Sequence, residues 1–295
     1  MVIIGKRAGQ LGNRLFMFAH FIANAIEYNY EVRNPSFYSY SQYFVGTRND
    51  FFCSFPAKRS KLHSLTLQSL FYRLINKCVL PLSRFSGISK ILSIQFLDIT
   101  KETYSEECYD MNDPGYVELA TSSKRLIIKD AWLFRDFKNF NKYADQIRAF
   151  FTPIEKHSAA VSSLISRVRK DCELLVGVHI RQGDYKRWQG GKYYFTTSEY
   201  AAIMKRFAST MPEKQIKFLI CSNIKQDEGI FKGLNHSMGN NHPLEDMYAF
   251  AKCDFLIGPP STYTAWASFY GSVPLCNLND SNVAFTPEDF HIAQG

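Results

Sequence analysis

The residues with the clearest capacity for chemistry follow an apolar run near residue 180. The apolar residues 174–178 lead directly into the sequence HIRQGD at 179–184. Side chains alternate along a strand, so His179 and Arg181 are expected on one face of it. A guanidinium at a strand end binds phosphate or carboxylate groups. An ion pair of Arg181 with Asp184 that only braces a turn, beside a buried His179, is an equally good interpretation of these residues alone.

Two further strand ends carry polar side chains. Ser222 and Asn223 follow one predicted strand, and Ser261 and Thr262 follow another. The carboxyl ends of parallel strands lie at one edge of a sheet, so we expect both pairs in the same crevice as the 179–184 segment. Ser261 precedes a predicted helix, whose first N–H groups bind phosphate well. Ordinary capping of that helix also explains Ser261.

A glycine-punctuated turn lies near the N-terminus. The apolar residues 2–4 predict a short strand, 5–14 a turn with three glycines, and 15–28 a helix. Strand, glycine turn and helix start form the local plan of phosphate-binding loops, because backbone N–H groups and the positive helix end converge there. The spacing matches neither common nucleotide-binding glycine motif, and a turn that merely packs strand against helix is the alternative.

Strands and helices alternate in the second half of the chain, which is typical of a parallel sheet wrapped by helices. The expected strands are 174–180, 217–221, 255–257 and 273–276, and the expected helices are 197–209, 244–251 and 262–270. In the first half we expect a strand at 126–129 and helical residues at 137–150. Residues 34–120 are expected to be irregular apart from one basic helix.

A chain of 295 residues is long enough for two domains, each with its own core. Thr152-Pro153 should end the preceding helix, because proline disfavours the helical conformation of the residue before it. We therefore predict an N-terminal domain at 1–152 and a C-terminal domain at 153–295.

The formal net charge of +8 is unevenly distributed. No zinc-finger spacing or RNA-binding signature accompanies it, so we do not expect a nucleic-acid partner. No acidic residue lies between Asp50 and Asp98, and apolar residues recur at helical spacing around residue 70. A basic amphipathic helix suits an anionic membrane surface, so residues 58–90 are a candidate membrane contact. A core-packing helix with a basic outer face is the alternative.

Cysteine usage and the start of the chain bear on the compartment. The seven cysteines are scattered and include no C-x-x-C pair, as expected for reduced thiols in a cytoplasmic protein. The first residues lack the layout of a signal peptide, and no apolar run approaches transmembrane length. We expect a cytoplasmic protein, with peripheral contact at the inner membrane if residues 58–90 bind lipid.

Three segments of the chain together form a recognisable set of motifs. Residues 9–16 read GQLGNRLF, 179–184 read HIRQGD, and 246–257 read DMYAFAKCDFLI, followed by ST at 261–262 and WA at 266–267. They resemble, in the same order, G-x-L-G-N-Q-hydrophobic-F, H-x-R-R-x-D, and D-L-x-L-M-x-x-C-D-x-x-I with S-S/T and W-A. These are motifs of the alpha-1,2-fucosyltransferases, and they frame nearly the whole chain.

The resemblance implies an α/β protein of the GT-B class, with two Rossmann-like domains facing across a cleft. It implies an acceptor-side domain at the N-terminus and a C-terminal domain that holds GDP-fucose. The implied reaction moves fucose to a hydroxyl of a glycan acceptor with inversion, without a metal ion or other cofactor. We expect an alpha-1,2 linkage in the synthesis of a surface polysaccharide such as O-antigen or capsule.

The resemblance also implies roles for single residues. Arg181 should contact the diphosphate, with His179 and Asp184 shaping its surroundings as the other catalytic candidates. Ser261 and Thr262 should meet phosphate at the helix start. Asp184 is the only acid of this motif, so it is the candidate base for the acceptor hydroxyl; orienting Arg181 or His179 is its alternative role.

Other donor-binding candidates include two departures from the family motifs. Gly12 and Asn13 should close over the donor from the N-terminal domain. The second arginine of H-x-R-R-x-D is Gln182 here, while the glutamine of G-N-Q is Arg14, so Arg14 is a candidate replacement for the lost charge.

The family's S-D-D after the second strand is Ser222-Asn223-Ile224 here. Asn223 cannot present a carboxylate to the two N–H donors of guanine. A glycosyltransferase that uses another nucleotide sugar is therefore one alternative function. A non-catalytic glycan- or nucleotide-binding protein and a basic membrane-surface scaffold are the others.

Overall fold

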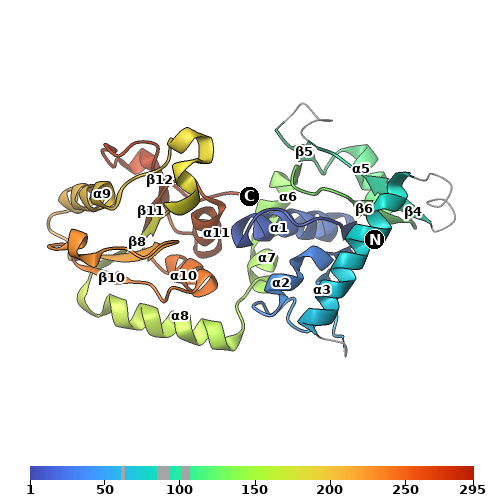
Figure 1. Cartoon of the computed structure of the whole chain (residues 1–295), viewed down its shortest axis with the longest axis horizontal. Coiled ribbons are helices and arrows are strands. Elements are labelled where there is room, and N and C mark those ends of the chain that lie inside the picture. Colours follow the sequence, from blue (N-terminus) through green and yellow to red (C-terminus); the bar gives the residue numbers. More distant parts are fainter. Residues whose placement is uncertain (61–63, 85–92, 101–106) are drawn as a thin grey trace. The chain divides into compact units, whose positions relative to one another are not determined.

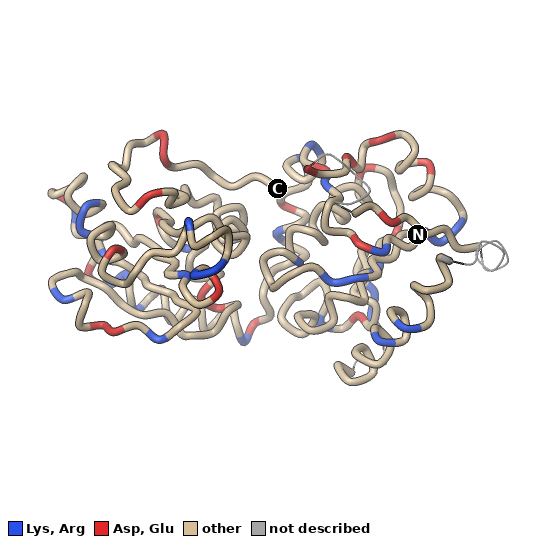
Figure 2. Tube along the Cα trace, turned by 45° about the horizontal axis from the view of Figure 1, so that its top comes forward, with Lys and Arg blue, Asp and Glu red and all other residues tan. Residues whose placement is uncertain are grey.

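The computed structural model describes residues 1–60, 64–84, 93–100 and 107–295 (Figure 1). They form two compact units: Met1–Ile154 together with Gly295, and Glu155–Gln294. Each unit contains a mostly parallel sheet with helices packed against it. Lysine, arginine, aspartate and glutamate positions are present on both units (Figure 2).

The second unit contains a sheet with the strand order β10-β9-β8-β11-β12-β13, parallel except for β13. Its strands are β8 (Leu174–Ile180), β9 (Ile216–Ser222), β10 (His236–Met238), β11 (Phe255–Gly258), β12 (Leu275–Asn277) and β13 (Phe290–His291). Its helices are α8 (Glu155–Val168), α9 (Thr197–Ser209), α10 (Pro243–Phe250) and α11 (Thr262–Gly271).

The central strand β8 is apolar because helices cover both of its faces. Val176, Val178 and Ile180 belong to one buried cluster with apolar residues of α9. On the opposite face Gly177 lies against the Phe250 ring of α10, where an added Cβ would come within 2.6 Å of that ring. A strand covered on both faces has no polar face, so it reads as a continuous apolar run.

The first unit has a sheet with the order β3-β2-β1-β6-β4, in which β3 alone among the described strands is antiparallel to its neighbour. Its strands are β1 (Val2–Ile4), β2 (Val32–Arg33), β3 (Ser54–Phe55), β4 (Ile94–Leu97) and β6 (Arg125–Ile128), and β5 (Tyr109–Asp110) and β7 (Phe134–Arg135) form a separate pair. Its helices are α1 (Leu11–Tyr28), α2 (Tyr38–Ser41), α3 (Leu65–Leu74), α5 (Pro114–Thr121), α6 (Phe137–Lys142) and α7 (Ala144–Phe150).

The predicted elements of the second unit are present, whereas the prediction for 34–120 was wrong. That interval contains α2, α5, β3, β4 and β5 besides the basic helix, which is α3. Its strands are two to four residues long, too short to show an alternating pattern. Helix α1 begins at Leu11 rather than near residue 15, so Gly12, Asn13 and Arg14 lie in its first turn.

No helix in the described part of the chain combines the length and apolar character needed to cross a membrane.

Candidate functional site

The candidate site lies where the second sheet reverses its strand order. Strand β8 pairs with β9 on one side and with β11 on the other, both in parallel. The chain proceeds from β8 through β9 to β10 in one direction and places β11 and β12 on the opposite side. Ligands of such sheets bind beyond the carboxyl ends of the strands at this reversal. The segments after β8, β9 and β11, which hold the predicted residues, therefore lie at one edge.

Arg181 follows the last residue of β8 and carries the positive charge of this edge. One of its terminal nitrogens lies 2.8 Å from Oδ2 of Asp184, and its guanidinium carbon lies 5.5 Å from the centre of the Tyr185 ring. Its Nε is buried and has no hydrogen-bond partner within the described residues. A buried N–H without an acceptor is costly, so a ligand oxygen that accepted it would be bound favourably.

The ion pair with Asp184 matches the braced-turn interpretation of the motif. The Asp184 side chain is 57% exposed and that of Arg181 28% exposed, so water weakens the pair. A diphosphate can replace such a carboxylate, because its oxygens accept the same donors and carry more charge. The geometry thus holds the guanidinium in place and leaves it accessible to a ligand.

His179, on β8, is a neutral packing element of the site. It is 4% exposed, and its ring lies 4.9 Å from that of Tyr263 at an angle of 30°. Burial, with the nearby charge of Arg181, lowers the pKa of His179 to about 3. The imidazole therefore adds no positive charge at neutral pH. Its Nδ1 has no hydrogen-bond partner among the described residues.

Gln182 connects the ends of β8 and β9. Its backbone N–H donates to Oδ1 of Asn223 over 2.9 Å, and its side-chain amide donates to the carbonyl of Phe195 over 3.0 Å. Gln226 donates to Oε1 of Gln182 and to Oγ of Ser222, at 3.0 Å in both cases. Ser222 and Asn223 therefore lie beside the Arg181 segment, as expected, and their side chains hold the junction together.

Ser261 and Thr262 begin α11. Ser261 caps the helix, because its hydroxyl accepts the N–H of Tyr263 at 3.2 Å. The hydroxyl of Tyr185 donates to the carbonyl of Pro260 over 2.6 Å, which connects the segment after β8 to the start of α11. The helix start therefore lies beside the Arg181 segment, where its N–H groups and dipole favour an anion.

The three candidates of the first unit lie in the first turn of α1. Gly12 is buried and Asn13 partly buried. The Arg14 guanidinium is 6% exposed, donates to the carbonyl of Gly9 and the hydroxyl of Ser39, and lies 4.9 Å from the centre of the Tyr40 ring. Burial lowers the pKa of Arg14. These contacts give Arg14 a packing role within its own unit.

Two tyrosines and a glutamine that were not predicted contact the site, beside Tyr185, which directly follows the motif in the sequence. Tyr200 accepts the backbone N–H of Arg181 at 3.5 Å. Tyr263 packs on His179, Tyr185 packs under Arg181, and Gln226 hydrogen-bonds Gln182. Tyr200 and Tyr263 lie on helices with an ordinary apolar spacing, so only Tyr185, directly after the motif, gave a local signal.

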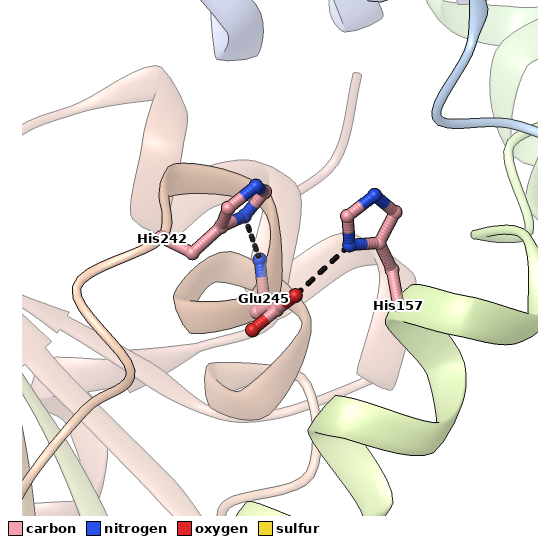
Figure 3. A group of neighbouring side chains, drawn as sticks. All are labelled: His157, His242 and Glu245. Atoms are coloured by element: carbon pink, nitrogen blue, oxygen red, sulfur yellow. Dashed lines mark hydrogen bonds and ion pairs between the residues drawn. The ribbon is translucent and has the colours of Figure 1, made fainter.

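A group of three side chains in the second unit could hold a metal ion (Figure 3). Nδ1 of His157, on α8, lies 2.9 Å from Oε1 of Glu245, on α10. His242 caps α10 by accepting the backbone N–H of Glu245 at 3.3 Å. The first contact joins α8 to α10 and the second caps α10, so the group is explained as a structural brace. Burial opposes ionisation of Glu245, but hydrogen bonds from His157 and Asn240 prevail and lower its pKa.

No protein-family model matches the sequence, and a search of curated protein sequences finds no match. Solved structures do match. The alpha-1,6-fucosyltransferase NodZ soaked with GDP-fucose aligns with a TM-score of 0.57 at 17% identity, over 96% of this chain and 97% of that chain. One NodZ structure comes from Bradyrhizobium and covers 94% of this chain and 95% of that chain at a TM-score of 0.54 and 17% identity.

Two further matches are structures solved with GDP or GDP-fucose. A mutant FUT1 of Arabidopsis thaliana in complex with GDP aligns with a TM-score of 0.57 at 12% identity, over 93% of this chain and 69% of that chain. POFUT1 in complex with GDP-fucose aligns with a TM-score of 0.54 at 10% identity, over 92% and 94%. The chain has the GT-B fold. The expected fold class is thereby confirmed.

The buried His179 predicts a loss of stability in acid. Its folded-state pKa of about 3 lies below the usual 6.5, so the unfolded chain binds the proton more tightly. Its stabilising contribution is complete above pH 6.5 and is lost as the pH falls towards 3. Between pH 6.5 and 5, protonation of this histidine in the unfolded chain should lower the free energy of unfolding by about 2 kcal/mol. Urea unfolding of the full chain at both pH values should show that the free energy of unfolding falls less in His179→Gln than in the parent. Equal decreases in the two proteins would contradict the prediction.

Proposed function

We propose that this protein is an inverting, metal-independent glycosyltransferase that moves fucose from GDP-fucose to a hydroxyl of a glycan. The observation that carries the proposal is Arg181, a guanidinium with an unsatisfied buried N–H at the strand-order reversal of a chain that has the fold of enzymes solved with GDP and GDP-fucose. The second unit, predicted as 153–295, is the proposed binding site of the nucleotide sugar.

In the proposed mechanism, Arg181 and the start of α11 stabilise the departing GDP. Negative charge grows on the diphosphate as the bond to the sugar breaks, so these donors bind the transition state more tightly than the substrate. Ser261 and Thr262 form the start of α11. The neutral His179 packs against the ring of Tyr263, and the two rings exclude water from this side of the site. No step requires a metal ion or another cofactor.

Asp184 is the proposed base that takes the proton of the acceptor hydroxyl. Its side chain is 57% exposed, which leaves it accessible to an acceptor hydroxyl once the diphosphate has displaced it from Arg181. The alternative role, orienting Arg181, uses the same contact. Gly12 and Asn13 remain predicted donor-binding residues, in the first turn of α1. Arg14 is retained as a packing residue there rather than as a phosphate contact.

The decisive substitution is Arg181→Ala. It should lower the rate of fucose transfer from GDP-fucose by about 10²–10³, the usual cost of removing one donor to a developing negative charge. Transfer is measured with a pool of glycan acceptors in the presence of EDTA. Arg167→Ala is the matched control, because Arg167 is an exposed arginine on α8 of the same unit. Full transfer activity in Arg181→Ala would overturn the proposal.

A glycosyltransferase with another nucleotide-sugar donor is the second candidate, favoured by Asn223. Its Oδ1 accepts the N–H of Gln182, so this side chain has no carboxylate for guanine and its acceptor atom is engaged. Donor identity then depends on backbone groups and neighbouring residues.

Nucleotide identity can be measured by thermal shift. We expect GDP to raise the melting temperature more than UDP or CDP at equal concentration, because a ligand stabilises the folded state according to its affinity. The shift should shrink in Arg181→Ala. A larger shift with UDP or CDP would assign the protein to the second candidate function, and binding of GDP without any donor turnover would indicate a non-catalytic binding protein.

We propose that α3 rests on an anionic membrane, which would place the enzyme at the cytoplasmic face of the inner membrane beside a polysaccharide precursor. Leu67, Leu70 and Leu74 are 45%, 53% and 54% exposed, while Gln68 is buried and donates to the carbonyl of Asp50. Phe71 of the same helix packs against Phe51 and Phe52, so α3 contacts the core through one face and exposes the three leucines on another. Residues 61–63 and 85–90 of the predicted contact lie outside the described residues.

Exposed leucines beside basic residues predict a lipid preference. The parent should bind vesicles of phosphatidylglycerol and little to vesicles of phosphatidylcholine, because Arg73 and Lys77 are exposed near the leucines. Replacing Leu67, Leu70 and Leu74 together by serine should reduce sedimentation with anionic vesicles by about tenfold or more. Replacing three exposed serines of α8 by alanine is the control: Ser162, Ser163 and Ser166. Undiminished binding of the leucine variant would contradict the membrane contact.

A further inference from the structure

An aromatic segment follows the Arg181 motif directly. We call residues 185–194 the aromatic loop; it includes parts of two short helical turns, Gly183–Lys186 and Trp188–Gly191. The ring of Trp188 lies 4.6 Å from that of Tyr185 and 5.4 Å from that of Tyr193, at interplanar angles of 36° and 35°. Three rings from separate turns therefore form one stack.

The stack is anchored at the candidate diphosphate site. Tyr185 is buried, its hydroxyl donates to the carbonyl of Pro260, and its ring lies beside the guanidinium of Arg181. Gln189, Gly190 and Gly191 have φ angles of 47°, 67° and 82°. Positive φ at a residue with a side chain is unfavourable, so this sharp turn is held in place by the surrounding structure.

The outer part of the stack is exposed to solvent. Trp188 is 39% exposed, whereas Trp266 is fully buried. Tyr193 is partly exposed. An indole in water next to a prospective sugar-transfer site is unusual, because aromatic side chains lose favourable burial there. Its flat apolar surface matches the C–H face of a pyranose ring.

The loop is also positively charged. Lys186, Arg187 and Lys192 are exposed, and no acidic residue lies between Asp184 and Glu199. Lys192 and Lys186 lie 5.1 and 5.5 Å from the ring centres of Tyr193 and Tyr194. Cations arranged around an aromatic stack favour a ligand that offers both a ring face and negative charge.

We propose that the aromatic loop binds the acceptor, and that the acceptor is an acidic glycan whose sugar ring packs on Trp188 and whose carboxylates meet Lys186, Arg187 and Lys192. This inference rests on the proposed function, because only a glycosyltransferase has an acceptor substrate. The stack begins at Tyr185, beside the guanidinium assigned to the diphosphate, and continues to the exposed Trp188, where a second substrate can approach.

Binding can be tested without any turnover. The probe is tetragalacturonate, with cellotetraose as the neutral comparison, and the readout is acrylamide quenching of tryptophan fluorescence in the full chain. Trp188 should be the most quenched tryptophan, and tetragalacturonate should protect it more than cellotetraose does. Trp188→Phe supplies the signal of the remaining tryptophans. Absence of protection by both oligosaccharides overturns the inference.

The effect of GDP on the quenching of Trp188 distinguishes an acceptor site from a donor site. GDP should leave the quenching of Trp188 unchanged and should bind Trp188→Ala as tightly as the parent. Protection by GDP, or loss of GDP affinity in Trp188→Ala, would assign the loop to the nucleotide and overturn the inference. In transfer assays, Trp188→Ala should raise the KM for the acceptor about tenfold with little change in the KM for the donor, and Trp188→Tyr should restore most of it.

The inference and the proposed function fail in different ways. Protection of Trp188 by tetragalacturonate without GDP binding would contradict the fucosyltransferase and retain an acidic-glycan site. GDP-dependent transfer with a parent-like acceptor KM in Trp188→Ala would retain the enzyme and remove the loop from acceptor binding.

Discussion

The pairing of β8 with both β9 and β11 is the constraint on which the candidate site depends. This strand has neighbours on both edges and helices on both faces, so its end cannot shift without disturbing the core of the second unit. Because the chain departs from it in opposite directions, the segments after three strands meet at one edge. Arg181 thus extends from the most restrained strand end of this sheet.

The electrostatics of this edge are simpler than the sequence suggests. His179 is held neutral by burial, and Gln182 occupies the interior with an uncharged amide. Two of the three guanidinium nitrogens of Arg14 donate hydrogen bonds inside its own unit. Positive charge near the strand ends of the second unit is therefore concentrated on Arg181, on the cations of the aromatic loop and on Lys225, which follows β9.

Sequence patterns predicted the second unit best at β8 and β9, which are apolar strands of seven residues each. The first unit was predicted poorly between residues 34 and 120, where strands of two to four residues carry no readable period. Site residues next to a motif, such as Arg181 and Ser261, could be predicted from local order. Tyr200 and Tyr263 could not, because their contacts with Arg181 and His179 depend on how separate helices pack.

The amide network of Gln182 constrains how this sequence can change over evolutionary time. The motif that it resembles has arginine at this position, but here Gln226 donates to the Gln182 carbonyl oxygen, and a guanidinium offers no acceptor in its place. Replacing Gln182 alone by arginine would place a guanidinium N–H opposite the side-chain N–H of Gln226. Gln182 and Gln226 are therefore energetically coupled. Arginine at position 182, next to Arg181, would require a second substitution at Gln226, so the buried hydrogen bond creates epistasis between the two positions.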